Sequence, residues 1–300
     1  MDERFAHVGE IELCYEIFGD PADPALLLVM GLGSQMIDWH EEFCAGLAGR
    51  GFHVIRFDNR DIGRSTHVRG RPPTPRQVLT RDRRAAAYTL DDLADDVAGL
   101  LAQLGRDAAH VVGVSMGGMI AQVLAARRPE RVLSLASIMS TTGARWRGQP
   151  AMRIMPFFLR KPPVTREESV ERTLALFRVV GSPAFDRDEE HLRAMSELAF
   201  DRGPDDAAGT GRQLAAIFAS GDRTPSLARI AAPTVVIHGT KDRLVAPSGG
   251  RATAAAIPGA RLEMIEGMGH DLPRDVWSRV IDLVVENARR ARPVDAAAAA

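Results

Sequence analysis

Short apolar runs alternate with amphipathic stretches along most of the chain. Residues 5–18 alternate between charged and apolar positions around Gly9, which predicts two antiparallel strands with one exposed face. Residues 25–30 are apolar without interruption, which is typical of a strand covered on both faces. Further strands are predicted at 52–58, 110–114, 131–140, 233–239 and 261–265.

Helical patterns fill most of the intervals between these strands. After Thr89, apolar residues recur every three or four positions up to Leu104, as on one face of an amphipathic helix. Other helices are predicted at 39–50, 116–128, 249–256 and 276–289. This alternation indicates an α/β fold: a mostly parallel, eight-stranded sheet with helices on both faces and two antiparallel strands at its start.

The pattern changes between residues 141 and 229. Strand-like runs are absent from this stretch of sequence, and helical periodicity, prolines and charged residues dominate it. We therefore predict a helical cap at 141–229, inserted after the sixth strand of a core formed by residues 1–140 and 230–295. The alanine run at 296–300 is predicted to be a disordered tail.

Composition and charge narrow the class of protein. The chain has 300 residues, of which 45% are hydrophobic, enough for a sizeable core. Lysine and arginine number 38 against 39 acidic residues, so charge provides no case for a nucleic-acid partner. The N-terminal sequence lacks the pattern of a secretory signal, and no apolar run has the length of a membrane span. We interpret Cys14 and Cys44 as buried free thiols and expect a cytoplasmic location; the sequence does not indicate an oligomeric state.

The stretch from His110 to Gly118 carries the candidate nucleophile. A predicted strand turns directly into a predicted helix at Ser115, within the sequence Gly-Val-Ser-Met-Gly. Such a turn presents a serine hydroxyl at the positive end of a helix, and it needs small residues where the helix crosses the backbone. Gly113 and Gly117 meet that need, so Ser115 is predicted to be a catalytic nucleophile.

A catalytic serine needs a base within hydrogen-bond reach and a carboxylate that orients the base. Asp242 and His270 each follow a later predicted strand, and the glycines beside His270 allow its loop to fold back over the serine. The order serine, aspartate, histidine is the one expected after a strand-turn-helix nucleophile. We therefore predict a triad of Ser115, His270 and Asp242.

Other polar residues of the chain are interpreted as structural, or as less favoured candidates for the triad. His238 lies at a strand end and is interpreted as a packing residue, while Glu266 and Asp271 are weaker alternatives to Asp242. An acidic cluster at the start of the helix after Thr89 is interpreted as solvated, dipole-favoured side chains, and no metal site is predicted. The members of this cluster are Asp91, Asp92, Asp95 and Asp96.

Acyl transfer also requires N–H donors for the negative oxygen that develops in the transition state. One donor is predicted to be the backbone N–H of Met116, directly after the nucleophile. The second is placed at Leu32, in the glycine-rich loop that follows the strand at 25–30. This chemistry requires no cofactor and no metal.

Four tracts of the chain resemble the α/β-hydrolase superfamily. They are MGLGSQMIDW, HVIRFDNRDIGRST, HVVGVSMGGMIAQ and IEGMGHDLP. The first is similar to the family's oxyanion loop, with Met30 where histidine is common, and residues 58–65 match its D-x-R-x-x-G-x-S turn. Within the superfamily the chain looks most like the aclacinomycin methylesterase group and related bacterial carboxylesterases.

The resemblance implies a serine hydrolase that cleaves carboxylic esters through an acyl-enzyme, acting on small to medium acyl esters or methyl esters of a hydrophobic acid. A thioesterase, an acyltransferase or a C–C bond hydrolase would use the same triad, and a non-catalytic hydrolase-like binding protein is a further alternative. Apolar cap residues would line the pocket for a small hydrophobic ester, and packing within the cap accounts equally well for each. These residues are Met155, Phe157, Phe158 and Phe177.

Residues 66–88 form a polar, arginine-rich segment that contains three prolines. We interpret this segment as a solvated and partly mobile insertion, because long polar segments between periodic elements are usually loops. The alternative is a basic lip that attracts an anionic substrate.

Overall fold

In the computed structural model, eight strands form one sheet within the described residues, which are 2–69, 72–80, 82–154, 157, 163–203 and 207–291. The sheet order is β1-β2-β4-β3-β5-β6-β7-β8. β2 pairs antiparallel with β1 and β4, and the remaining neighbours are parallel, as the sequence predicts. The strands are β1 (Arg4–Val8), β2 (Ile11–Phe18), β3 (Ala25–Val29), β4 (His53–Phe57), β5 (Ala109–Val114), β6 (Val132–Ile138), β7 (Thr234–Gly239) and β8 (Arg261–Ile265).

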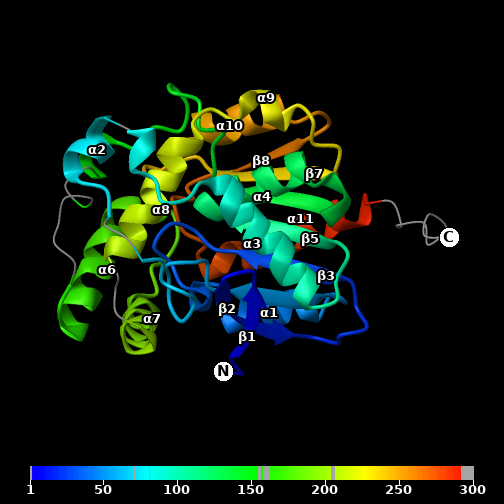
Figure 1. Cartoon of the computed structure of the whole chain (residues 1–300), viewed down its shortest axis with the longest axis horizontal. Helices are drawn as coiled ribbons and strands as arrows, with labels where there is room; N and C mark the ends of the chain where they lie inside the picture. Colours follow the sequence, from blue (N-terminus) through cyan, green and yellow to red (C-terminus); the bar gives the residue numbers. More distant parts are fainter. Residues whose placement is uncertain are drawn as a thin grey trace.

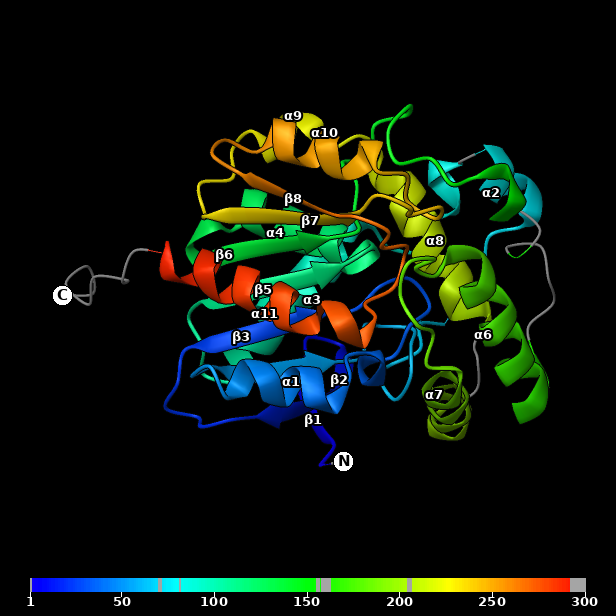
Figure 2. The ribbon, with the colours of Figure 1, turned by 180° about the vertical axis from the view of Figure 1, so that it is seen from behind.

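Helices cover both faces of the sheet and enclose two apolar cores. α3 (Leu90–Gln103), α4 (Met116–Arg127) and α10 (Ser248–Ala256) lie on the face seen in Figure 1. α1 (Glu41–Ala48) and α11 (Arg274–Arg289) lie on the opposite face, which Figure 2 shows. Side chains alternate between the faces along each strand. In β3, for example, Leu27 and Val29 join the first core, whereas Leu26 and Leu28 join the second.

The described part of the chain between β6 and β7 is helical, as predicted. It contains η4 (Met152–Ile154), α6 (Arg166–Val180), α7 (Glu189–Arg202), α8 (Ala207–Ser220) and α9 (Thr224–Leu227). α6, α7 and α8 lie beside the sheet, not against either of its faces (Figures 1 and 2). We keep the division into a core at 1–140 and 230–295 and a cap at 141–229 as a proposal. The tail predicted at 296–300 lies outside the described residues.

The arginine-rich segment 66–88 contains more structure than a solvated loop. α2 (Pro75–Thr80) and η2 (Arg83–Ala85) form within it, and both lie against α8. At its end, the buried Tyr88 donates a hydrogen bond of 2.7 Å from its hydroxyl to Asp61. The polar composition of the segment did not indicate these elements, because the residues they pack against come from the segment between β6 and β7. Two short 3-10 turns, η1 (Met36–Asp38) and η3 (Pro129–Arg131), complete the described elements.

Two local predictions are confirmed in the structure, and a third is confirmed only in part. Cys14 and Cys44 are buried free thiols. The Thr89 side chain forms a capping box with Asp92 at the start of α3, so this acid satisfies backbone groups at a helix end. Asp96, of the same acidic cluster, is not solvated as predicted: it is buried and pairs with Arg60.

Candidate active site

Ser115 lies at a sharp turn between β5 and α4. Its backbone adopts φ 56° and ψ −118°, a conformation that residues with a Cβ rarely occupy. The surrounding packing leaves no room for a side chain at Gly113 or Gly117. A Cβ on Gly117 would lie 2.1 Å from the Val29 carbonyl oxygen, and one on Gly113 would lie 2.3 Å from the Gly117 oxygen. The glycines therefore permit the close crossing of strand and helix that the sequence predicts.

Hydrogen bonds fix the strained turn in place. The Ser115 N–H donates to the Ile138 carbonyl over 2.9 Å, and the Ser140 hydroxyl donates to the Ser115 carbonyl over 2.8 Å. Ile138 is the last residue of β6, the next strand in the sheet, and Ser140 lies two residues beyond it. The turn is consequently held from the neighbouring strand, and the Ser115 side chain takes no part in holding it.

The loop after β3 lies directly against Ser115. A Cβ on Gly31 would lie 3.2 Å from the Ser115 Cβ and 3.8 Å from its Oγ. Within the described residues, the backbone N–H groups of Leu32 and Met116 donate to no acceptor. These are the two groups predicted to bind the oxyanion, and Met116 is also the first residue of α4, where the helix dipole favours negative charge.

Asp242 and His270 meet beyond the ends of β7 and β8. The His270 Nδ1 lies 2.7 Å from Asp242 Oδ2. The second carboxylate oxygen accepts N–H bonds from Leu244 and Val245 at 2.9 and 2.8 Å. Burial opposes ionisation of Asp242, but the charges and hydrogen bonds of His270 and His238 outweigh it and lower its pKa to about 2. Asp242 is thus a fixed anion beside one nitrogen of the imidazole.

The three predicted triad residues follow β5, β7 and β8. These strands and β6 are consecutive neighbours in one half of the sheet. Parallel strands end at the same edge, which is where doubly wound sheets bind their ligands. A sequence profile of the alpha/beta hydrolase fold matches residues 24–273. The chain belongs to the α/β-hydrolase family.

Known members of the family support this assignment over nearly the whole chain. Rhodomycin D methylesterase of Streptomyces sp. (strain C5) is 32% identical, over 97% of this chain and 99% of the relative. Rhodomycin D methylesterase of Streptomyces peucetius is 30% identical over the same shares. The enol-lactonase from Burkholderia xenovorans LB400 shares the fold, with a TM-score of 0.73, 24% identity and coverage of 95% and 100% of the two chains. The resemblance found in the sequence is therefore confirmed.

His238 contacts Asp242 in the structure, whereas the sequence predicts only a packing role for this histidine. It is fully buried, and its Nε2 lies 2.9 Å from the Val245 carbonyl oxygen and 3.4 Å from Asp242 Oδ2. It therefore shares one carboxylate oxygen with His270 and helps to keep Asp242 ionised. The spacing of four residues between His238 and Asp242 was the available signal, but the strand-end position favoured a packing role.

The weaker alternatives to Asp242 lie elsewhere. Glu266 is exposed. Asp271 accepts a hydrogen bond from the Ser182 hydroxyl, and burial raises the pKa of this carboxyl. The loop that contains His270 is also hydrogen-bonded to the end of α6, because the His270 N–H donates to the Val180 carbonyl over 2.8 Å. Asp242 is thus the carboxylate that the structure brings to His270.

The predicted pocket residues are only partly described. Phe157 and Phe177 are half-buried, and Phe177 belongs to α6. Met155 and Phe158 lie outside the described residues.

Within the described chain, no group of three or more histidine, cysteine, aspartate or glutamate side chains could hold a metal ion. No helix in that same part of the chain is both long and apolar enough to cross a membrane.

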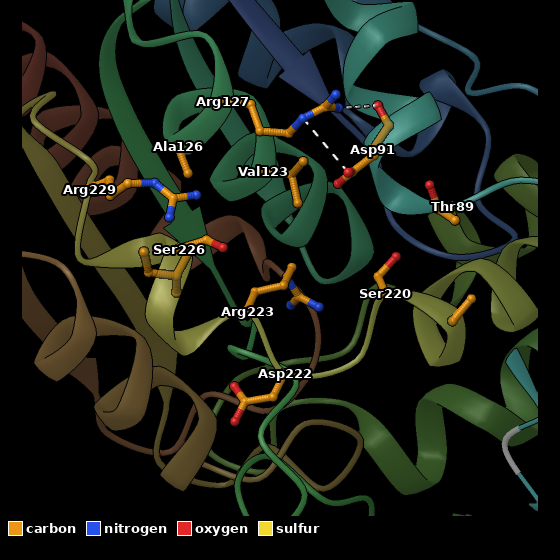
Figure 3. A pocket seen from close by; sticks show the side chains of 12 residues that line it. Thr89, Asp91, Val123, Ala126, Arg127, Ser220, Asp222, Arg223, Ser226 and Arg229 are labelled. Carbon is orange, nitrogen blue, oxygen red and sulfur yellow. Dashed lines mark hydrogen bonds and ion pairs between the residues drawn. The ribbon is translucent and has the colours of Figure 1, made fainter.

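A cavity of about 450 Å³ opens at a different place, between α3, α4 and residues 219–229 (Figure 3). None of the predicted catalytic or oxyanion residues lines it. Two of the three arginines that line it have partners: Arg127 pairs with Asp91 and Asp95, and Arg223 donates to the carbonyls of Thr141 and Gly221. The third, Arg229, is exposed. This cavity is therefore separate from the candidate site at the sheet edge.

Proposed function

We propose that the chain is a serine carboxylic ester hydrolase that uses Ser115, His270 and Asp242. One observation carries this proposal: His270 is hydrogen-bonded to a buried, ionised Asp242 at the sheet edge that also presents the strained Ser115. Methylesterases that are at least 30% identical over nearly the whole chain add support.

In the acylation step, the free nitrogen of His270 accepts the Ser115 hydroxyl proton as the oxygen attacks the ester carbonyl carbon. Asp242 stabilises the imidazolium that forms, because its own pKa of about 2 keeps it ionised. The N–H groups of Leu32 and Met116 bind the oxyanion of the tetrahedral intermediate. His270 then returns the proton to the leaving alkoxide, and the alcohol departs.

Deacylation repeats the same steps with water as the nucleophile. His270 removes a proton from water as the oxygen attacks the acyl carbon of the Ser115 ester. Collapse of the second tetrahedral intermediate breaks the bond to Ser115 Oγ, which recovers its proton from the imidazolium. The products are a carboxylic acid and the free enzyme.

The substrate class that we propose is a methyl ester of a hydrophobic acid. Relatives named as methylesterases favour methanol as the leaving group. The predicted cap residues Phe157 and Phe177 would contact the acid part, since apolar and aromatic side chains line most small-molecule pockets. Met155 and Phe158 remain part of this proposal through the sequence alone.

A product assay with methyl esters tests this proposal. We expect the wild-type chain to release methanol and free acid from the methyl ester of a polycyclic aromatic acid. Ser115→Ala and His270→Gln should each lower kcat/KM by at least about a thousandfold. Retained hydrolysis in Ser115→Ala would contradict the proposal. Faster cleavage of the matching thioester, or transfer of the acyl group to an added alcohol, would indicate a thioesterase or an acyltransferase instead.

A further inference from the structure

Gln213 joins the segment between β6 and β7 to the loop that carries a predicted oxyanion donor. It lies on α8 and is completely buried. Its Oε1 accepts a hydrogen bond of 3.0 Å from the Gly33 N–H, and its Nε2 donates one of 2.9 Å to the Arg60 carbonyl. One side chain thus bridges the loop after β3 and the turn after β4.

The Gly33 contact bears on Leu32, the adjoining residue. Gly31, on the other side of Leu32, lies against the Ser115 side chain. Leu32 is therefore flanked by two contacts, that of Gly31 with Ser115 and that of Gly33 with Gln213. Together they set the direction of the Leu32 N–H. An oxyanion donor contributes only when it is aimed in advance at the oxygen that becomes charged.

Gln213 is itself held firmly. The neighbouring Arg212 makes a buried ion pair with Asp61, with an N–O distance of 2.7 Å. Thr210, one turn earlier, lies against Gly33, where an added Cβ would come within 3.0 Å of the threonine hydroxyl. These contacts fix α8 on both segments that Gln213 bridges, so the amide has little freedom to turn away.

We propose that Gln213 is a positioning residue for ester hydrolysis, which holds the Leu32 N–H in the direction that binds the oxyanion. This inference rests on the proposed esterase function. Gln213 touches no reacting atom, and its effect passes through Gly33. It therefore acts on the transition state and leaves ground-state binding of the ester largely unchanged.

Gln213→Met tests the proposal, because methionine has a similar length and removes both polar contacts. Ser220→Ala is the matched control: its hydroxyl accepts a 2.9 Å bond from the Leu90 N–H, so the variant removes another bond between α8 and the core. With p-nitrophenyl butyrate as probe, we expect Gln213→Met to lower kcat about ten- to a hundredfold and to change KM by less than about twofold. Affinity for a trifluoromethyl ketone should fall by a similar factor. Ser220→Ala should keep both values.

Gln213→Glu provides a rescue that depends on pH. In its protonated form the introduced carboxyl accepts from Gly33 and donates to the Arg60 carbonyl, as the amide does. In its ionised form it repels that carbonyl and places a negative charge near the oxyanion. We expect the kcat of Gln213→Glu, relative to wild type, to fall as pH rises, whereas the ratio for Gln213→Met stays flat.

Hydrogen–deuterium exchange separates this inference from the esterase proposal. Faster exchange of the peptide spanning 30–36 in Gln213→Met, but not in Ser220→Ala, is expected whether or not the chain cleaves esters. Unchanged exchange, unchanged kcat, or an equal loss in Ser220→Ala would overturn the positioning role. A wild-type chain that cleaves no ester and is not inhibited by the ketone would overturn the esterase proposal, and the catalytic role of Gln213 with it.

Discussion

Ser115 is held in a backbone conformation that disfavours its own side chain. Its φ of 56° is positive, which a Cβ makes costly, by about 1–3 kcal/mol in comparable cases. The bonds to Ile138 and Ser140 over-determine the turn and keep it in this state. The strain accompanies the presentation of the hydroxyl and contributes nothing to stability.

Replacing Ser115 with glycine should therefore stabilise the fold. We expect Ser115→Gly to raise the free energy of unfolding by about 1 kcal/mol relative to Ser115→Ala, because both lack the hydroxyl and only alanine keeps the Cβ. Urea denaturation of the two variants measures the difference. Equal stability of the two would show that the turn carries no strain.

The candidate site residues that the sequence predicts are those whose position follows from local pattern and chain order. Ser115, Asp242 and His270 each follow a strand, and the family fold fixes their order. The contact of His238 with Asp242, four residues later, was set aside because the strand-end position favoured a packing role. Gln213 was not singled out, because its partners are set by tertiary contacts. Gln213 bonds to Gly33, which is 180 residues away, and no pattern along the chain connects the two.

At the scale of elements, buried charges join the helices that follow β6 to the turn after β4. Arg202, at the end of α7, lies 2.9 Å from Asp58 and also pairs with Glu3. Arg212 on α8 pairs with Asp61 in the same turn. The sequence predicted both the helices and the turn. It could not predict which of many arginines would pair, because the choice depends on how the two segments meet.

Breaking one of these pairs should be costly, because it leaves a charge buried without its partner. We expect Arg202→Met to lower the free energy of unfolding by about 3–5 kcal/mol, as measured by urea denaturation. Asp58→Asn combined with Arg202→Met should recover part of this loss, since the orphaned charge is then removed.

Arg166→Met is the matched control for that experiment. Arg166 pairs with Asp201, and both side chains are about half exposed, so the variant should change stability little. A loss in Arg202→Met no larger than in Arg166→Met would contradict the role of the buried pair.

For the whole molecule, the two cores that flank the sheet bury titratable groups together with apolar ones. His110, on β5, contacts the Ser134 hydroxyl over 2.9 Å, and burial lowers its pKa from 6.5 to about 4. The folded chain therefore keeps this imidazole neutral at a pH where the unfolded chain protonates it. Linkage then requires stability to fall as pH drops from about 6.5 to about 4.

His110→Gln should flatten this part of the pH–stability curve. The histidine accounts for a loss of up to about 3 kcal/mol between those two pH values. Urea midpoints of wild type and variant at a series of pH values measure it. The exposed His7→Gln variant serves as control and should keep the wild-type slope; equal slopes in all three chains would contradict this account.

The central claim is that Ser115 is the nucleophile of an ester hydrolase, and active-site labelling tests it most directly. A fluorophosphonate probe reacts with an activated serine, which displaces fluoride and forms a phosphonyl ester. We predict one adduct per wild-type chain, mapped by mass spectrometry to the peptide that contains Ser115, and none in Ser115→Ala. A wild-type chain without an adduct, or a folded Ser115→Ala chain that is still labelled, would contradict the account.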